Sequence, residues 1–139
     1  MNKLVKGITV LICITVFSCG KNYDQIPDLP FSFQASINNQ LPRLNAAGGV
    51  EVVSNNAIGV AGLILYKTNS GRIVAYDRCS SVNPSQKNKV EYVGGNLVED
   101  KVSGAYFDLN DGSPAGAPAE RPLRNYSVTI NGDIIMVIN

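Results

Sequence analysis

The chain has 139 residues, with 12 Lys and Arg against 11 Asp and Glu, and it contains no histidine. This length predicts a single domain. The near-neutral charge and the lack of any run of basic residues argue against a nucleic-acid partner. The lack of histidine excludes hydrolytic triads in their usual form.

Residues 1–18 are predicted to be a signal peptide. Lysines lie near its start, and the apolar run at residues 8–17 is too short to cross a bilayer as a helix. Residues 16–19, Val-Phe-Ser-Cys, resemble the lipobox of bacterial lipoproteins. This resemblance implies cleavage before Cys19 and attachment of fatty acyl chains, such as palmitate, to Cys19. It also implies a lipid anchor in the cell envelope, on the periplasmic face or at the outer membrane or cell surface. The alternative is an ordinary secretory signal with an incidental cysteine.

Residues 19–30 are predicted to form a tether after the acylated cysteine. The segment is polar, contains two prolines and shows no hydrophobic period. In an extended form it would hold the domain up to about 30 Å from the membrane. From Phe31 to Ile37 apolar and polar residues alternate, which predicts a half-buried strand. Asn38-Asn39 then predicts a turn.

The rest of the chain predicts short strands separated by turns. The strand segments are residues 50–53, 63–66, 72–76, 90–93, 97–99, 105–108, 126–130 and 134–138. Asn131-Gly132 is the strongest turn signal, because it supplies the two positive φ angles of a type I′ hairpin. No segment carries a helical hydrophobic stripe of useful length. We therefore expect residues 31–139 to form an all-β antiparallel sandwich, with a core large enough to fold without metal or disulfide.

A family resemblance lies in the second half of the chain. Residues 103–113 are Ser-Gly-Ala-Tyr-Phe-Asp-Leu-Asn-Asp-Gly-Ser, followed by Gly-Ala-Pro-Ala at 116–119 and Arg-Pro-Leu at 121–123. This order resembles the second cluster loop of the Rieske iron–sulfur family, Cys-x-x-His-Gly-Ser-x-Phe-Asp, with the Gly-Pro-Ala and Pro-Leu that follow it. The resemblance covers about residues 59–138. It implies a Rieske-like β-sandwich with a small inserted lobe at about residues 79–104.

The resemblance also identifies the positions of the cluster ligands. A Rieske [2Fe–2S] cluster is held by two cysteines and two histidines. Cys79 matches the first cysteine, whereas Ser81, Asp100 and Ser103 stand where the family has His, Cys and His. This set cannot hold the cluster and is also poor for zinc, so we expect no cofactor and no metal. We expect the two loops to be joined by hydrogen bonds among Ser80, Ser81, Asp100 and Ser103 instead.

Three functions follow from these observations. The favoured one is a non-catalytic binding or structural module of the cell envelope, not an enzyme. An envelope protein would dock at its inserted lobe and the neighbouring loop 114–122, through the polar residues Ser80, Ser81, Asn83, Asp100, Lys101 and Ser103. The second is electron transfer, as the fold implies, with an unusual cofactor or redox partner. The third is thiol redox chemistry at Cys79, although the adjacent Arg78 should point away from it on an extended segment.

Overall fold

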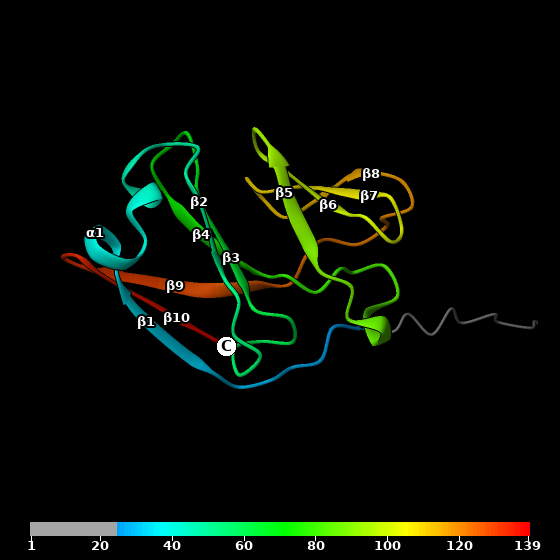
Figure 1. Cartoon of the computed structure of the whole chain (residues 1–139), viewed down its shortest axis with the longest axis horizontal. Helices are drawn as coiled ribbons and strands as arrows, with labels where there is room; N and C mark the ends of the chain where they lie inside the picture. Colours follow the sequence, from blue (N-terminus) through cyan, green and yellow to red (C-terminus); the bar gives the residue numbers. More distant parts are fainter. Residues whose placement is uncertain (1–24) are drawn as a thin grey trace, which may run out of the picture.

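The computed structural model describes residues 25–139, whose regular secondary structure consists almost entirely of strands (Figure 1). The strands are β1 (Ser32–Ser36), β2 (Val50–Val53), β3 (Leu63–Lys67), β4 (Ile73–Asp77), β5 (Val90–Gly94), β6 (Leu97–Asp100), β7 (Ala105–Asp108), β8 (Pro114–Gly116), β9 (Asn125–Asn131) and β10 (Ile134–Ile138). The helical elements are short: α1 (Ile37–Gln40) and the 3₁₀ turns η1 (Pro42–Asn45) and η2 (Pro84–Gln86). This content confirms the all-β prediction. Within residues 25–139, no helix is long and apolar enough to cross a membrane.

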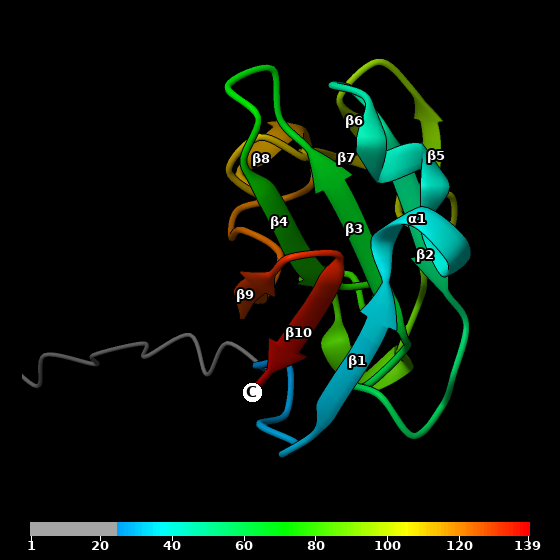
Figure 2. The ribbon, with the colours of Figure 1, turned by 90° about the vertical axis from the view of Figure 1, so that its left-hand side faces the viewer.

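Six strands form the larger sheet in the order β1-β10-β9-β4-β3-β2, and all neighbours are antiparallel (Figure 2). Its central strands carry apolar residues at consecutive positions because both faces of the sheet are covered. Leu63 and Leu65 point into one core, which α1 and η1 also line. Ile64 and Tyr66 point into a second core on the opposite face. None of these four side chains is more than 2% exposed.

The smaller sheet, in the order β5-β6-β7-β8, forms the second core together with the larger sheet. Val98 of β6 and Phe107 of β7 are fully buried and belong to the same cluster as Tyr76 of β4. Burying a phenylalanine of this kind stabilises the fold by about 1.5–3 kcal/mol. The lobe extends beyond the predicted residues 79–104, because β8 and the buried Leu123 also belong to it. We call residues 79–123 the tip lobe.

The predicted strands agree with the observed ones to within one residue at each end. Strand β8 was not predicted, because its Pro-Ala-Gly sequence has the composition of a loop. Helix α1 replaces the predicted turn after β1. Its start is capped by Ser36, whose hydroxyl accepts a hydrogen bond of 3.1 Å from the backbone N–H of Asn39.

The hairpin between β9 and β10 is confirmed, but its turn lies one residue later than predicted. Asn131 still pairs with Ile134 in the sheet, and within the predicted Asn-Gly pair only Gly132 has a positive φ, 59°. The type I′ assignment is therefore wrong. The carboxylate of Asp133 explains the shift, since it accepts hydrogen bonds from the Ser36 hydroxyl and from the backbone N–H of Asn38.

Residues 25–30, which we call the strap, lie along the domain. Ile26 is 9% exposed and packs with Ala61 and Cys79, and Asp28 forms an ion pair with Arg124 at 2.6 Å. The predicted tether, residues 19–30, is thus attached to the domain along its described part. The predicted signal peptide, residues 1–18, and the predicted acylation site Cys19 lie outside the described residues.

Candidate functional site

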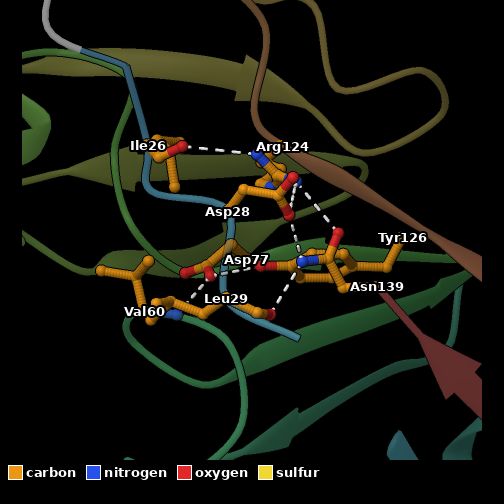
Figure 3. A network of polar contacts seen from close by, with 8 residues as sticks. All are labelled: Ile26, Asp28, Leu29, Val60, Asp77, Arg124, Tyr126 and Asn139. Atoms are coloured by element: carbon orange, nitrogen blue, oxygen red, sulfur yellow. Dashed lines mark hydrogen bonds and ion pairs between the residues drawn. The ribbon is translucent and has the colours of Figure 1, made fainter. Parts of the chain in front are cut away.

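The buried carboxylate of Asp77, at the end of β4, organises the first loop of the tip lobe. It accepts hydrogen bonds from the backbone N–H groups of Val60 (2.6 Å), Ala61 (3.1 Å) and Cys79 (2.7 Å). The hydroxyl of Tyr126 donates a fourth bond of 2.6 Å (Figure 3). Burial and the hydrogen bond to this carboxylate raise the pKa of Tyr126 above its usual range. A buried carboxylate is stable only with such donors. The sequence signal for it is a single acidic residue at the end of an apolar strand.

Cys79 lies in the interior of the protein. Its side chain is fully buried, and its sulfur lies 3.6 Å from the carbonyl oxygens of Ser80 and Pro84. The strap covers it through Ile26. As expected, Arg78 points elsewhere, because its guanidinium donates to the carbonyl of Val90 and to a serine hydroxyl on the β2 side. Apolar burial disfavours a thiolate, so the geometry gives no support to thiol redox chemistry.

Asp100 holds the second loop and links it to the first. Its buried carboxylate accepts hydrogen bonds from the backbone N–H groups of Val102 (3.0 Å) and Ser103 (3.3 Å) and from the Ser103 hydroxyl (2.7 Å). The Ser80 side chain donates a further bond. Burial alone would raise the pKa of Asp100, but the bonds from Ser103, Ser80 and the backbone outweigh it and hold this pKa below its usual range. The carboxylate therefore joins the two loops in its ionised form.

Ser81 has a different partner from the other three positions. Its hydroxyl donates a 2.6 Å hydrogen bond to the carbonyl oxygen of Arg121, and the Arg121 guanidinium donates to the carbonyl of Ser81 at 3.3 Å. The expected hydrogen-bond link between the loops is thus confirmed for Ser80, Asp100 and Ser103. Ser81 instead ties the first loop to the segment that returns to β9.

These side chains do not fit a [2Fe–2S] cluster. Two neutral serine hydroxyls replace the imidazole ligands, and both are used in internal hydrogen bonds. Asp100 replaces a thiolate with a hard carboxylate whose oxygens accept bonds from its own loop. Within residues 25–139, no three His, Cys, Asp or Glu side chains are grouped as metal ligands would be. Thiolate and imidazole are the ligands that such clusters use.

The predicted docking residues include buried side chains, the half-buried Ser103 and exposed side chains. Ser80, Ser81 and Asp100 are buried, so the expectation that they form an exposed face is wrong for these three. Their side chains are needed inside, where they join the loops. The exposed side chains of the tip lobe include Asn83, the lysines Lys87, Lys89 and Lys101, the acidic residues Glu91, Asp111 and Glu120, and Val102. Val102 is an unpredicted member of this set and is 73% exposed.

Arg124 attaches the strap to the end of the chain. Its guanidinium donates to the carbonyl oxygen of Ile26 (3.3 Å), to Asp28 (2.6 Å) and to the side-chain oxygen of Asn139 (2.9 Å) (Figure 3). Asn139 in turn donates to Asp28 and to the carbonyl of Leu29. A hollow of about 230 Å³ lies between the strap and the tip lobe, lined by Gln25, Ile26, Ser81 and residues 121–124. Sequence reasoning missed this cluster, because its members lie far apart in the chain.

Solved ferredoxin structures resemble this chain. One is the Sphingomonas yanoikuyae B1 ferredoxin, with a TM-score of 0.52 and 19% identity over 70% of this chain and 93% of that one. Another is the ferredoxin of carbazole 1,9a-dioxygenase from Nocardioides aromaticivorans IC177, with a TM-score of 0.50 and 16% identity. The match covers 79% of this chain and 97% of that ferredoxin. No protein-family model and no curated protein matches the chain. The chain therefore has the Rieske-like all-β fold.

Proposed function

We propose that this protein is a lipid-anchored, exported binding module of the cell envelope that has the Rieske-like fold and carries no cluster. The observation that supports this most is the hydrogen-bond network of Asp100. A carboxylate stands at the position of a ligand cysteine, and its oxygens are bonded to Ser80, Ser103 and the backbone. The loops of the tip lobe are therefore fixed by the protein's own side chains, and the lobe presents a defined surface without a metal centre.

The binding surface in this proposal is the exposed part of the tip lobe, and its partner is an envelope protein. Loops positioned by a rigid scaffold are where binding residues concentrate. Asn83, Lys101 and Val102 are exposed beside the buried network. The anchor is supported by the lipobox resemblance at Cys19. More than one acyl chain makes such an anchor stable.

Electron transfer is the second candidate, and the comparisons favour it, because the similar solved structures are named ferredoxins. This function needs a redox centre. The side chains at the four ligand positions are Cys79, Ser81, Asp100 and Ser103, and the last three are not cluster ligands. We rank it second on the chemistry of these side chains.

Iron and sulfide analysis of the purified protein separates the two candidates. The protein is produced under iron-replete, anaerobic conditions, with the Sphingomonas yanoikuyae B1 ferredoxin produced in parallel as the positive control. We expect a colourless protein without stoichiometric iron or a cluster EPR signal. A stoichiometric cluster that is reduced reversibly would establish the electron carrier and overturn the proposal.

The anchor is tested with two cysteine variants. Cys19→Ala should abolish acylation and leave either an uncleaved precursor or a protein released from the membrane. Cys13→Ala, inside the apolar run of the leader, is the matched control and should be acylated as the parent is. A Cys19→Ala protein that is cleaved and fractionates with membranes like the parent would refute the lipid anchor.

A further inference from the structure

Among residues 25–139, β2 is the last strand of the larger sheet, and its outer edge is open. The N–H of Lys67 donates to the carbonyl of Gly49 at 2.9 Å, just before the first residue pair of β2 and β3. Hydrogen-bonded and non-hydrogen-bonded pairs alternate along an antiparallel ladder. The N–H and C=O groups of Val50 and Val52 therefore point away from β3, toward the open edge.

Strand β5 is likewise an edge of the smaller sheet, and Arg78 ties the two edges together. The N–H of Val90 donates to the carbonyl of Arg78 at 2.8 Å, on the side away from β6. Two residues later, the N–H and C=O of Tyr92 point the same way by the same alternation. The Arg78 guanidinium donates to the carbonyl of Val90 (3.4 Å) and to the hydroxyl of Ser54 (3.1 Å), which directly follows β2. The open edges of β2 and β5 are therefore held together at one end.

A groove of about 610 Å³ lies between these two edges, which Figures 1 and 2 both place beside each other. Its lining includes Val50 and Val52 of β2, Tyr92 of β5 and, before β2, Arg43, Ala46 and Gly48. The side chains of Val52 and Tyr92 are 42% and 44% exposed. The Tyr92 hydroxyl donates to the carbonyl of Gly95 at 3.2 Å, which fixes the ring. Clefts that bind ligands have volumes of about 300–1,000 Å³, so the groove has the size of a binding site.

The charge of the groove is positive at the end where β2 begins. Of the described residues that line it, Arg43 is the charged one, and it forms no ion pair with another described residue. The acidic neighbours in sequence, Glu51 and Glu91, lie on the opposite faces of their strands from Val52 and Tyr92. Glu51 accepts a hydrogen bond of 3.0 Å from the backbone N–H of Arg43, and Glu91 is paired with a lysine. Neither carboxylate lines the groove.

We infer that this groove binds an extended segment of a partner protein, which adds to the sheet as a strand antiparallel to β2. The segment would bond to the open backbone groups of Val50 and Val52 and place apolar side chains against Val52 and Tyr92. An antiparallel strand ends where β2 begins, so its C-terminal end would carry an acidic residue beside Arg43. This site goes beyond the proposed docking surface of the tip lobe, and it depends neither on the anchor nor on the lack of a cluster.

The test titrates two synthetic peptides into the isotope-labelled full chain in detergent micelles and follows its amide resonances. The acidic probe is acetyl-Thr-Val-Thr-Val-Thr-Asp-amide, and the control peptide carries lysine in place of aspartate. We expect the acidic peptide to shift the amide signals of Val50, Val52 and Tyr92 and to bind several-fold more tightly than the lysine peptide. Arg43→Glu should reverse this preference, whereas Arg72→Glu, in the exposed β3–β4 turn, should preserve it.

A proline variant tests the main-chain bonds. Val52→Pro removes the open N–H without removing a bond to β3, and it should weaken binding of the acidic peptide several-fold. The matched control is Gln34→Pro on β1, the other edge of the same sheet. The N–H of Asn139 donates to the carbonyl of Phe31, so the Gln34 N–H also points outward, and this variant should bind as the parent does. If Val52→Pro does not fold, the reversal by Arg43→Glu decides alone.

Three results overturn the inference. The first is the absence of amide shifts at the groove, including shifts confined to Asn83, Lys101 and Val102, which would leave the proposed docking surface intact. The second is equal binding of the two peptides by the parent. The third is a dimer that forms without peptide and is abolished by Val52→Pro, because it would assign the groove to a second copy of the chain.

Discussion

Asp100 is a buried carboxylate that keeps its charge through hydrogen bonds alone. Its donors come from its own loop and, through Ser80, from the loop before it. Removing a buried acceptor that has several donors lowers the stability of the fold, because each donor loses its partner and stays buried away from water. Asp100 thus has a structural role, because it joins the two loops of the tip lobe.

Asp100→Ala should therefore lower the free energy of unfolding by about 2–4 kcal/mol. Lys101→Ala, the exposed neighbour, is the matched control and should stay within about 0.5 kcal/mol of the parent. Both values come from urea unfolding. An Asp100→Ala protein as stable as the parent would show that the loops do not depend on this network.

The lowered pKa of Asp100 also predicts that the free energy of unfolding depends on pH in the acid range. The pKa of Asp100 is lowered in the folded protein, so its contribution to stability is present above the unfolded-state pKa of about 3.9. It is lost as the pH falls through the folded-state pKa. The stability difference between the parent and Asp100→Asn should shrink over this range, as measured by urea unfolding at several pH values. A constant difference down to the acid limit would contradict the assignment.

The raised pKa values of two buried tyrosines predict how the stability of the fold changes at alkaline pH. Burial and the nearby charge of Asp111 raise the pKa of Tyr76 to about 12, and burial with the Asp77 hydrogen bond raises that of Tyr126. Both phenols hold their protons more tightly in the folded state, so stability is full below about pH 10 and is lost as the pH rises through the folded-state values.

At about pH 11 the folded protein should therefore show less phenolate absorbance than the denatured protein. The hydrogen bond to Glu99 also raises the pKa of the exposed Tyr106, which adds to this difference. Tyr76→Phe and Tyr126→Phe should each remove one of these late-titrating groups. Equal absorbance of folded and denatured parent would show that both side chains ionise normally.

At the scale of elements, the loop before β3 is shaped by its approach to Asp77. Gly59 has φ of 62°, and a Cβ there would contact the Asp77 carboxylate and the Tyr126 hydroxyl. Gly71, in the β3–β4 turn, has φ of 85° with open space around it. The two glycines share a left-handed backbone and differ only in crowding.

Gly71→Ala should cost about 1–2 kcal/mol of stability from backbone strain alone. Gly59→Ala should cost clearly more, because the new methyl group also displaces the acceptor of four hydrogen bonds. Thermal and urea unfolding of the pair measure the difference. Equal losses would mean that the loop moves aside and that the close approach to Asp77 is unimportant.

The strands were predictable because alternation and turn chemistry are local, as the agreement at β2, β7 and β10 shows. The pattern of β3 and β4 predicts strands equally well but does not tell which core each side chain enters. The burial of Cys79 was not predictable, since it depends on Ile26, far away in the chain. The role of Asp77 was missed for the same reason: a carboxylate looks the same in sequence whether it is buried or exposed.

At the scale of the whole molecule, Arg124 joins the start of the described chain to its last residue. Arg124→Ala removes its bonds to Ile26, Asp28 and Asn139. We expect faster amide hydrogen exchange in the strap and a loss of about 1–2 kcal/mol in stability. Arg72→Ala should change neither. A strap that stays protected in Arg124→Ala would show that burial of Ile26 alone holds it.

The attachment of the strap also has a mechanical consequence. A pull on the chain at Gln25 would reach the contacts of Ile26, Asp28 and Asn139 before it reached any strand. Beyond them the load would pass into β1, which lies antiparallel to β10. The Arg124 contacts would thus break first under the pulling force. The strap would then come away from the domain and extend while both sheets stayed intact. Forced unfolding is governed by the rate of such opening rather than by equilibrium stability, and a single-molecule pull from Gln25 should show this small extension before the main rupture.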